Sequence, residues 1–231
     1  MQPSPPSGLG DSASPGGRIP LSVKLLYTAF MAVLVPCYWS AYGPTNFLYF
    51  CDVALFMTLA ALWTENALLA STPLVGILLP QMLWCADVFG TLAGRPITGM
   101  TAYMFDANLP LFTRGLSSFH GWLPFLLLWV VWRLGYDRRA FWVWTALALT
   151  LMVVCFFLLP PPPAPPETPN IPVNVNYVYG FSDDRPQQWM DPRLFFLLML
   201  VAQPLVIILP AHLLLRTFFP APRDARIGEA A

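Results

Sequence analysis

The chain has 231 residues, of which 57% are hydrophobic and only 10% are charged, and its formal net charge is zero. Soluble domains carry about 25% charged residues, so this composition excludes an ordinary soluble globular protein. A neutral chain also argues against nucleic acid as a partner, because nucleic-acid-binding proteins present a basic patch or stripe. Several nearly uncharged stretches are long enough to cross a hydrocarbon core about 30 Å thick. The sequence therefore predicts a polytopic membrane protein.

Six apolar segments are predicted to cross the membrane, in an all-α six-helix bundle. In chain order they are Leu21–Tyr38, Phe47–Trp63, Leu68–Phe89, Ser117–Leu134, Ala140–Leu159 and Leu194–Leu215. Each must be helical, because lipid offers the backbone no hydrogen-bond partner. A transmembrane β-barrel requires segments of about ten residues with alternating polarity, and these runs do not alternate.

The segment before the first span is rich in Pro, Ser and Gly, so residues 1–20 are predicted to be a disordered tail. It lacks the basic region of a signal peptide, and no convincing small-residue cleavage site follows. The first span is therefore expected to stay as an anchor. Residues 21–216 form the predicted transmembrane domain, and residues 217–231 form a second tail.

The second span carries a carboxylate, Asp52, directly after Cys51. A charged side chain at such depth costs roughly 2.5–3.5 kcal/mol on insertion scales, and it usually faces a bundle interior and indicates function. Thr45 lies seven residues earlier and is predicted to share the stripe of Asp52. The alternative is that Asp52 only pairs with a neighbouring helix as a structural polar contact.

Further polar residues gather at the same predicted end of the third and fourth spans. Asp87 and Cys85 close the third span, and His120 opens the fourth. A metal site formed by Asp52, Asp87 and His120 is conceivable, but the spacing has none of the regularity of a ligand motif. No pair of the four cysteines has C-x-x-C spacing, and the sequence leaves disulfide pairing open. No cofactor is expected.

Two long connections separate the later spans. Residues 90–116 include Pro96–Phe112, a half-apolar stretch that could form an interfacial or re-entrant segment. Residues 160–193 begin with four prolines, which form a stiff spacer. The aromatic and Asn content of residues 174–181 instead favours an ordered cap, and long connections are often functional lids or linkers.

The Lys and Arg residues predict the orientation in the membrane. One side collects Arg18, Lys24, Arg133, Arg138, Arg139, Arg216, Arg223 and Arg226; the other collects Arg95, Arg114, Arg185 and Arg193. Cytoplasmic loops carry the excess of basic residues. Both termini are therefore expected in the cytoplasm, with a plasma membrane as the location, and the two long connections are expected outside.

The stretch Tyr49–Phe56, with its Cys-Asp pair, resembles the second span of the YwaF-like integral membrane proteins of bacteria. The resemblance continues at His120 and Gly121, and more weakly at Asn176 and Tyr177. The six-span layout and the long connection before the last span are also similar, so the resemblance covers most of residues 21–216. That family is similar to animal transmembrane acyltransferases of phospholipid metabolism, and more distantly to intramembrane hydrolases of fatty acid esters.

The resemblance implies that Cys51 is a nucleophile and His120 its base. A thiol becomes an effective nucleophile when a base or a positive neighbour favours the thiolate. Asp52 or Asp87 could orient the imidazole, and Asn176 or Tyr177 could donate to an oxyanion. The substrate would then be a membrane lipid ester entering from the outer leaflet. The alternative is a non-catalytic scaffold, sensor or small-molecule carrier.

Overall fold

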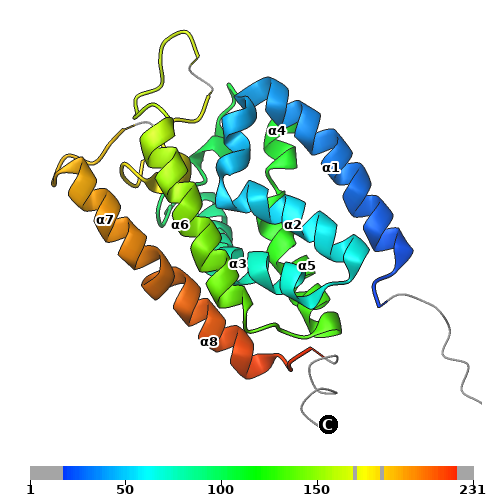
Figure 1. The fold of residues 1–231 in the computed structure, drawn as a ribbon. Helices are drawn as coiled ribbons and strands as arrows, with labels where there is room; N and C mark the ends of the chain where they lie inside the picture. Colours follow the sequence, from blue (N-terminus) through cyan, green and yellow to red (C-terminus); the bar gives the residue numbers. More distant parts are fainter. Residues whose placement is uncertain (1–17, 169–170, 183–184, 223–231) are drawn as a thin grey trace, which may run out of the picture.

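The structure, a computed structural model, describes residues 18–168, 171–182 and 185–222, so most of both predicted tails lies outside the described residues. Within these ranges every regular element is helical (Figure 1). The α-helices are α1 (Leu21–Tyr42), α2 (Phe50–Thr64), α3 (Ala67–Leu92), α4 (Leu111–Leu116), α5 (Phe119–Leu134), α6 (Ala140–Leu158), α7 (Pro192–Ala202) and α8 (Leu209–Phe218). A π-helical segment, Gln203–Ile208, joins α7 to α8, and short 3₁₀ turns cover Pro44–Leu48, Ala102–Phe105 and Val175–Tyr177.

Five helical stretches are long and apolar enough to cross a membrane. They are α1, α3, the continuous stretch Leu111–Leu134 that contains α4 and α5, α6, and the stretch Pro192–Phe218 that contains α7 and α8. The sixth predicted span, α2, has only 15 residues and rises about 22 Å at 1.5 Å per residue. The all-α class and the membrane assignment are thus confirmed.

The start of the second span differs from the prediction. The sequence pattern placed it at Phe47, but α2 begins at Phe50, and the 3₁₀ turn Pro44–Leu48 precedes it. Gly43 allows the break after α1, because its φ of 74° lies in the left-handed region that favours glycine. Thr45 therefore does not share a helical stripe with Asp52.

The third helix is the centre of the bundle. It makes the most extensive contacts in the structure, with α5, α2 and α6. Small buried side chains such as Ala70, Ser71 and Gly76 let these neighbours approach closely. The last span, α7 to α8, packs along the outside of α6 and α3 (Figure 1).

The bundle has two distinct ends. The start of α1, the α2–α3 turn, the α5–α6 connection and the end of α8 meet at one end, here called the tail end (Figure 1). Arg133 donates to the carbonyl oxygen of Arg18 at 2.7 Å, and the Tyr136 N–H donates to Pro220 at 2.8 Å. The described parts of the two long connections, residues 93–110, 159–168, 171–182 and 185–191, lie at the opposite end, here called the loop end (Figure 1). The described chain thus begins and finishes at the same end.

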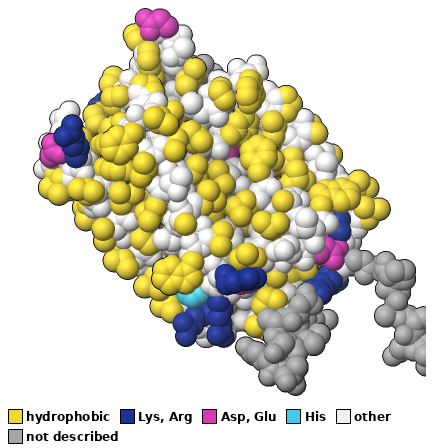
Figure 2. All heavy atoms as spheres, in the orientation of Figure 1, with side chains coloured by type: hydrophobic (Ala, Val, Ile, Leu, Met, Phe, Trp, Pro, Cys, Tyr) yellow, Lys and Arg dark blue, Asp and Glu magenta, His cyan; other side chains and the backbone are white. Residues whose placement is uncertain are grey.

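The outer surface matches a lipid environment. Large apolar side chains are widely exposed, with Leu26, Trp142 and Leu158 each 72–74% accessible. Figure 2 shows hydrophobic side chains over most of the visible face, while Lys and Arg gather near the tail end. Exposed apolar surface of this extent marks contact with another protein or with a membrane. Together with the five apolar helices of span length, it indicates that this surface faces membrane lipid.

Glu65 fastens the α2–α3 turn to the start of α1 at the tail end. Its carboxylate accepts hydrogen bonds from the backbone N–H groups of Arg18 and Ile19 and from Lys24 Nζ, the last at 2.7 Å. Burial raises the pKa of Glu65, but these hydrogen bonds outweigh it, so the pKa lies below its usual value. The ionised form is therefore the one that stabilises the fold.

Acid should remove this stabilisation. A carboxyl whose pKa is lowered on folding contributes fully above its unfolded pKa, and the contribution is lost as the pH falls through the folded pKa. We expect Glu65→Gln to lower the melting temperature at pH 7, with the difference from wild type disappearing under acidic conditions. Melting curves across pH in detergent measure this. The exposed Glu167→Gln serves as control, and an equal effect of both variants would contradict the assignment.

Candidate functional site

A cavity of about 670 Å³ lies within the bundle near the loop end. Its wall comes from the end of α1, the start of α2, the second half of α3, the two long connections, the start of α5 and the α7–α8 junction. The polar residues that line it are Asn46, Cys51, Asp52, Gln81, Ser117, His120, Asn176 and Gln203. Its aromatic residues are Tyr38, Tyr42, Tyr49, Phe50, Trp84, Tyr103, Tyr177 and Phe181.

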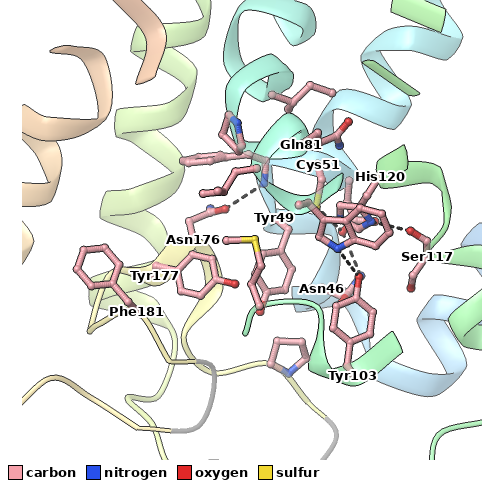
Figure 3. Close-up of a pocket in the computed structure, with 18 of the residues that line it drawn as sticks. Asn46, Tyr49, Cys51, Gln81, Tyr103, Ser117, His120, Asn176, Tyr177 and Phe181 are labelled. Atoms are coloured by element: carbon pink, nitrogen blue, oxygen red, sulfur yellow. Dashed lines mark hydrogen bonds between the residues drawn. The ribbon is translucent and has the colours of Figure 1, made fainter. Parts of the chain in front are cut away.

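The structure brings most of the sequence-predicted site residues to this one cavity. Cys51, His120, Asn176 and Tyr177 line it (Figure 3), and so does Asp52. These residues come from α2, α5 and the connection before α7, so only the tertiary fold unites them. Thr45 and Asp87, two predicted supporting residues, do not line the cavity.

Asp52 is 3% exposed and has weak partners. Its Oδ2 accepts from Asn46 Nδ2 at 3.3 Å and from the Cys51 thiol at 3.8 Å, while its Oδ1 is buried without a hydrogen bond. Among the described residues that line the cavity there is no Lys or Arg. The carboxyl group therefore has unused hydrogen-bonding capacity facing the interior.

The Cys51 thiol lies in the first turn of α2, where the helix dipole favours negative charge. Its hydrogen-bond partner in the described chain is Asp52, at 3.8 Å, and not His120. The predicted nucleophile and the predicted base thus share a cavity without a direct hydrogen bond between them. All four cysteines are free thiols.

The His120 ring is held in one orientation. Its Nδ1 lies 2.8 Å from the carbonyl oxygen of Ser117, and since a carbonyl only accepts, Nδ1 must carry the proton. The ring stacks on Trp84 with centroids 5.3 Å apart and on Phe119 at 4.1 Å. The Ser117 hydroxyl forms a hydrogen bond with the Tyr38 hydroxyl, with 2.6 Å between the two oxygens. In the neutral ring, Nε2 keeps its lone pair and is able to act as a base.

Asn176 acts as a cap for α2 from a distant part of the chain. Its Oδ1 accepts from the Phe50 N–H at 3.0 Å, and its Nδ2 donates to Leu48 at 2.9 Å. A helix begins with backbone N–H groups that lack a partner within the helix, so this side chain fixes the start of the helix that carries Cys51. Asn176 and Tyr177 both adopt positive φ, 59° and 58°, a conformation that is uncommon outside glycine.

Asp87 has a structural role in this arrangement. Its carboxylate accepts from the N–H groups of Ile97, Thr98, Gly99 and Thr101 and from the Thr101 hydroxyl. Asp87 therefore fixes the 93–110 connection, whose Met100 and Tyr103 line the cavity. That connection contains the 3₁₀ turn Ala102–Phe105. The stretch Pro96–Phe112, predicted as an interfacial or a re-entrant segment, ends inside α4, which begins at Leu111.

Several lining residues were missing from the predicted site. Trp84 donates from Nε1 to the Tyr103 hydroxyl at 3.1 Å and stacks on His120. Gln81 lies one turn before Cys85 on α3 and has no hydrogen bond in the described chain. Gln203 opens the π-helical segment, and such segments are frequent at functional sites. In the sequence, the signal for both glutamines was an amide inside an apolar run.

A metal centre finds no support among the residues that the structure describes, because these contain no group of three or more potential His, Cys, Asp or Glu ligands. Asp87, one member of the conceivable site, is fully used by the 97–101 segment. The resemblance to YwaF-like proteins stays a prediction: comparison with protein-family models, with curated proteins and with solved structures finds no match.

Proposed function

We propose that this integral membrane protein is a thiol-dependent acyltransferase or acyl-ester hydrolase that acts on a membrane lipid. The observation that carries the proposal is that Cys51 on α2 and His120 on α5 line one cavity. A nucleophile and a base on separate elements, with the base oriented by a third group, are the typical parts of covalent acyl transfer. Here the Ser117 carbonyl orients the imidazole.

In the proposed reaction, Nε2 of His120 takes the thiol proton and Cys51 Sγ attacks the ester carbonyl carbon. The carbonyl electrons move to oxygen, and collapse of the adduct expels an alcohol, which receives the proton from His120. The product is a thioester on Cys51. Water then yields a fatty acid, or a lipid hydroxyl yields a new ester, with His120 again transferring the proton and the thiol restored.

The cavity suits an acyl chain beside a polar centre. Leu79, Leu83, Met199 and Ile207 contribute apolar walls from α3 and the last span. Ligand sites of this kind combine an apolar lining with a few placed polar groups. With the predicted orientation, the loop end faces outside, so a lipid of the outer leaflet of the plasma membrane is the proposed substrate.

A second candidate function rests on a different observation. The Cys51 thiol directs its hydrogen toward Asp52, and no hydrogen bond joins it to His120. A protein that only binds a lipid or another amphiphile requires no such bond. In that case the polar groups of the cavity would hold the ligand, and no covalent step would follow.

Acylation of Cys51 separates the two functions. We expect protein in lipid nanodiscs to be acylated at Cys51 by an alkyne-tagged fatty acyl p-nitrophenyl ester, with release of p-nitrophenolate. His120→Phe, which keeps an aromatic ring against Trp84, should slow acylation by about 100-fold or more, the size of general-base effects. Mass spectrometry of the cysteine-containing peptides measures the rate of acylation.

The matched control is Cys37→Ser, which removes a half-buried thiol outside the cavity and should leave acylation unchanged. Cys51→Ser should give a folded protein without labelling. If Cys51 is acylated no faster than Cys37 or Cys155, and His120→Phe changes nothing, the enzymatic proposal fails. Lipid that still co-purifies with the protein would then favour the binding function.

A further inference from the structure

Gln81 is the most deeply buried polar side chain of the cavity wall that makes no hydrogen bond. It is 2% exposed, and neither Nε2 nor Oε1 has a hydrogen-bond partner in the described chain. It follows Pro80 in the middle of α3, and both residues line the cavity. In Figure 3, Gln81 lies on the same side of the pocket as Cys51 and His120, away from Tyr177 and Phe181.

An unpaired amide at this depth is costly. Transfer of an amide from water to an apolar environment without hydrogen bonds costs about 2–7 kcal/mol. Lipid chains beside the helix offer no hydrogen bonds that would reduce this cost. Buried polar groups without partners require an explanation such as a ligand or a catalytic role. Gln81 lines the cavity, so a molecule bound in the cavity is the partner that its position favours.

The amide that the sequence suggested as an oxyanion donor is already used. Asn176, which the sequence suggested as an oxyanion donor, donates to Leu48 and accepts from Phe50. Turning the Asn176 side chain toward a substrate would break these two hydrogen bonds, which hold the first turn of α2 and therefore Cys51 in place. Gln81 is different, because its two N–H bonds are unused and α3 is packed on three sides by α2, α5 and α6.

We infer that Gln81 is the oxyanion donor of the proposed acyl transfer, with Nε2 donating to the carbonyl oxygen of the lipid ester. This inference rests on the proposed function. When Cys51 Sγ bonds to the carbonyl carbon, the π electrons move to the oxygen, and the Gln81 N–H stabilises the charge that develops there. The proton of the thiol goes to His120, and the expelled alcohol takes it back. Gln81 gains and loses no proton.

Two electrophiles distinguish an oxyanion donor from a residue that only shapes the pocket. The fatty acyl p-nitrophenyl ester acylates Cys51 through a tetrahedral oxyanion, whereas an N-alkyl iodoacetamide of the same chain length alkylates it by displacement at carbon, without one. We expect Gln81→Met to slow acylation by about 100- to 1,000-fold, the effect of losing one oxyanion donor. Alkylation should stay within about twofold of wild type.

The stability of the variant gives a second readout. Methionine has a similar shape and no amide, so removing the unpaired polar group should leave the melting temperature unchanged or raise it. A loss of activity without a loss of stability is typical of a residue retained for function. The control Thr72→Val changes another buried side chain of α3, whose hydroxyl bonds only Leu68 of its own helix, and should alter neither rate.

Each outcome decides the assignment. Slower acylation with unchanged alkylation supports it, whereas unchanged rates for both reagents overturn it. Equal loss of both rates also overturns it, because Gln81 would then act on the thiol or the pocket. Should Gln81→Met not fold, Gln81→Asn keeps the amide one methylene short and should show the same selective loss. A wild-type protein that the ester does not acylate at Cys51 would instead refute the proposed function itself.

Discussion

Replacing Gly76 with alanine should destabilise the bundle by about 3 kcal/mol, the upper part of the range for overpacked cores. A Cβ at Gly76 would lie 1.7 Å from Cε2 and 1.8 Å from Nε1 of Trp144. Trp144 is fully buried on α6 and cannot swing into solvent, so α3 and α6 must separate. A lower melting temperature in detergent measures the effect.

The strain should also reach the candidate site. Gly76 lines the cavity, and Trp144 packs edge-on against Phe50 with centroids 6.0 Å apart. Phe50 is the first residue of α2, directly before Cys51. Movement of the Trp144 ring therefore displaces the helix start that presents the thiol, and acylation of Cys51 should fall together with stability.

Two further variants test the cause. Gly115→Ala adds the same methyl group where no other atom of the described chain lies within 4 Å and should change the melting temperature little. Trp144→Leu removes the ring, so the cost of Gly76→Ala should be much smaller in the double variant than in wild type. Equal costs in the two backgrounds would contradict the steric explanation.

The fold class was predictable because the membrane constrains the chain so strongly. An apolar run long enough to cross the membrane has to be helical, because its backbone groups find no hydrogen-bond partner in lipid. Five of the six predicted spans correspond to helices long enough to cross a membrane. The start of α2 was not predictable in this way. Asn176, at a separation of 126 residues, supplies the partner that fixes Phe50 as its first residue, and no local pattern contains that contact.

The candidate site was predictable where polarity contradicted its surroundings. Cys51, Asp52 and His120 were identified as polar groups at one end of apolar spans, and they do line a common cavity. Asp87 was selected on the same signal but clamps the backbone of residues 97–101. In the sequence, a carboxylate that lines a cavity and one that binds a nearby loop both look like an acidic residue near a helix end. The sequence therefore could not distinguish the role of Asp52 from that of Asp87.

Gln81 illustrates the opposite error. An amide inside a transmembrane helix commonly bonds to a neighbouring helix, and nothing in the sequence distinguishes that role from an unpaired group facing a cavity. Only the positions of α2, α5 and α6 around α3 decide that no partner from the described residues reaches Gln81. The informative property is thus the absence of a contact between residues that are distant in sequence.

Asp87→Asn should loosen the 97–101 segment locally while leaving the rest of the bundle folded. The carboxylate accepts five hydrogen bonds, the shortest from the Thr98 N–H at 2.6 Å and the Thr101 hydroxyl at 2.7 Å. Asparagine replaces one acceptor oxygen with an amide that faces donors and cannot accept. Hydrogen bonds to charged groups contribute about 1.5–3 kcal/mol each, so a local loss of about 2–3 kcal/mol is expected.

Hydrogen exchange measures this loss directly, because local opening exposes the four bonded N–H groups of this segment. Exchange there should become about 30- to 100-fold faster, since 1.4 kcal/mol corresponds to a factor of ten. Asp106→Asn is the matched control in the same connection, because the exposed Asp106 carboxylate accepts hydrogen bonds in the described chain only from the backbone N–H and Nδ2 of Asn108. Unchanged exchange at 97–101 in Asp87→Asn would refute the clamp.

Since Met100 and Tyr103 line the cavity, acylation of Cys51 should also fall in Asp87→Asn and persist in Asp106→Asn, which would connect the clamp to the proposed chemistry.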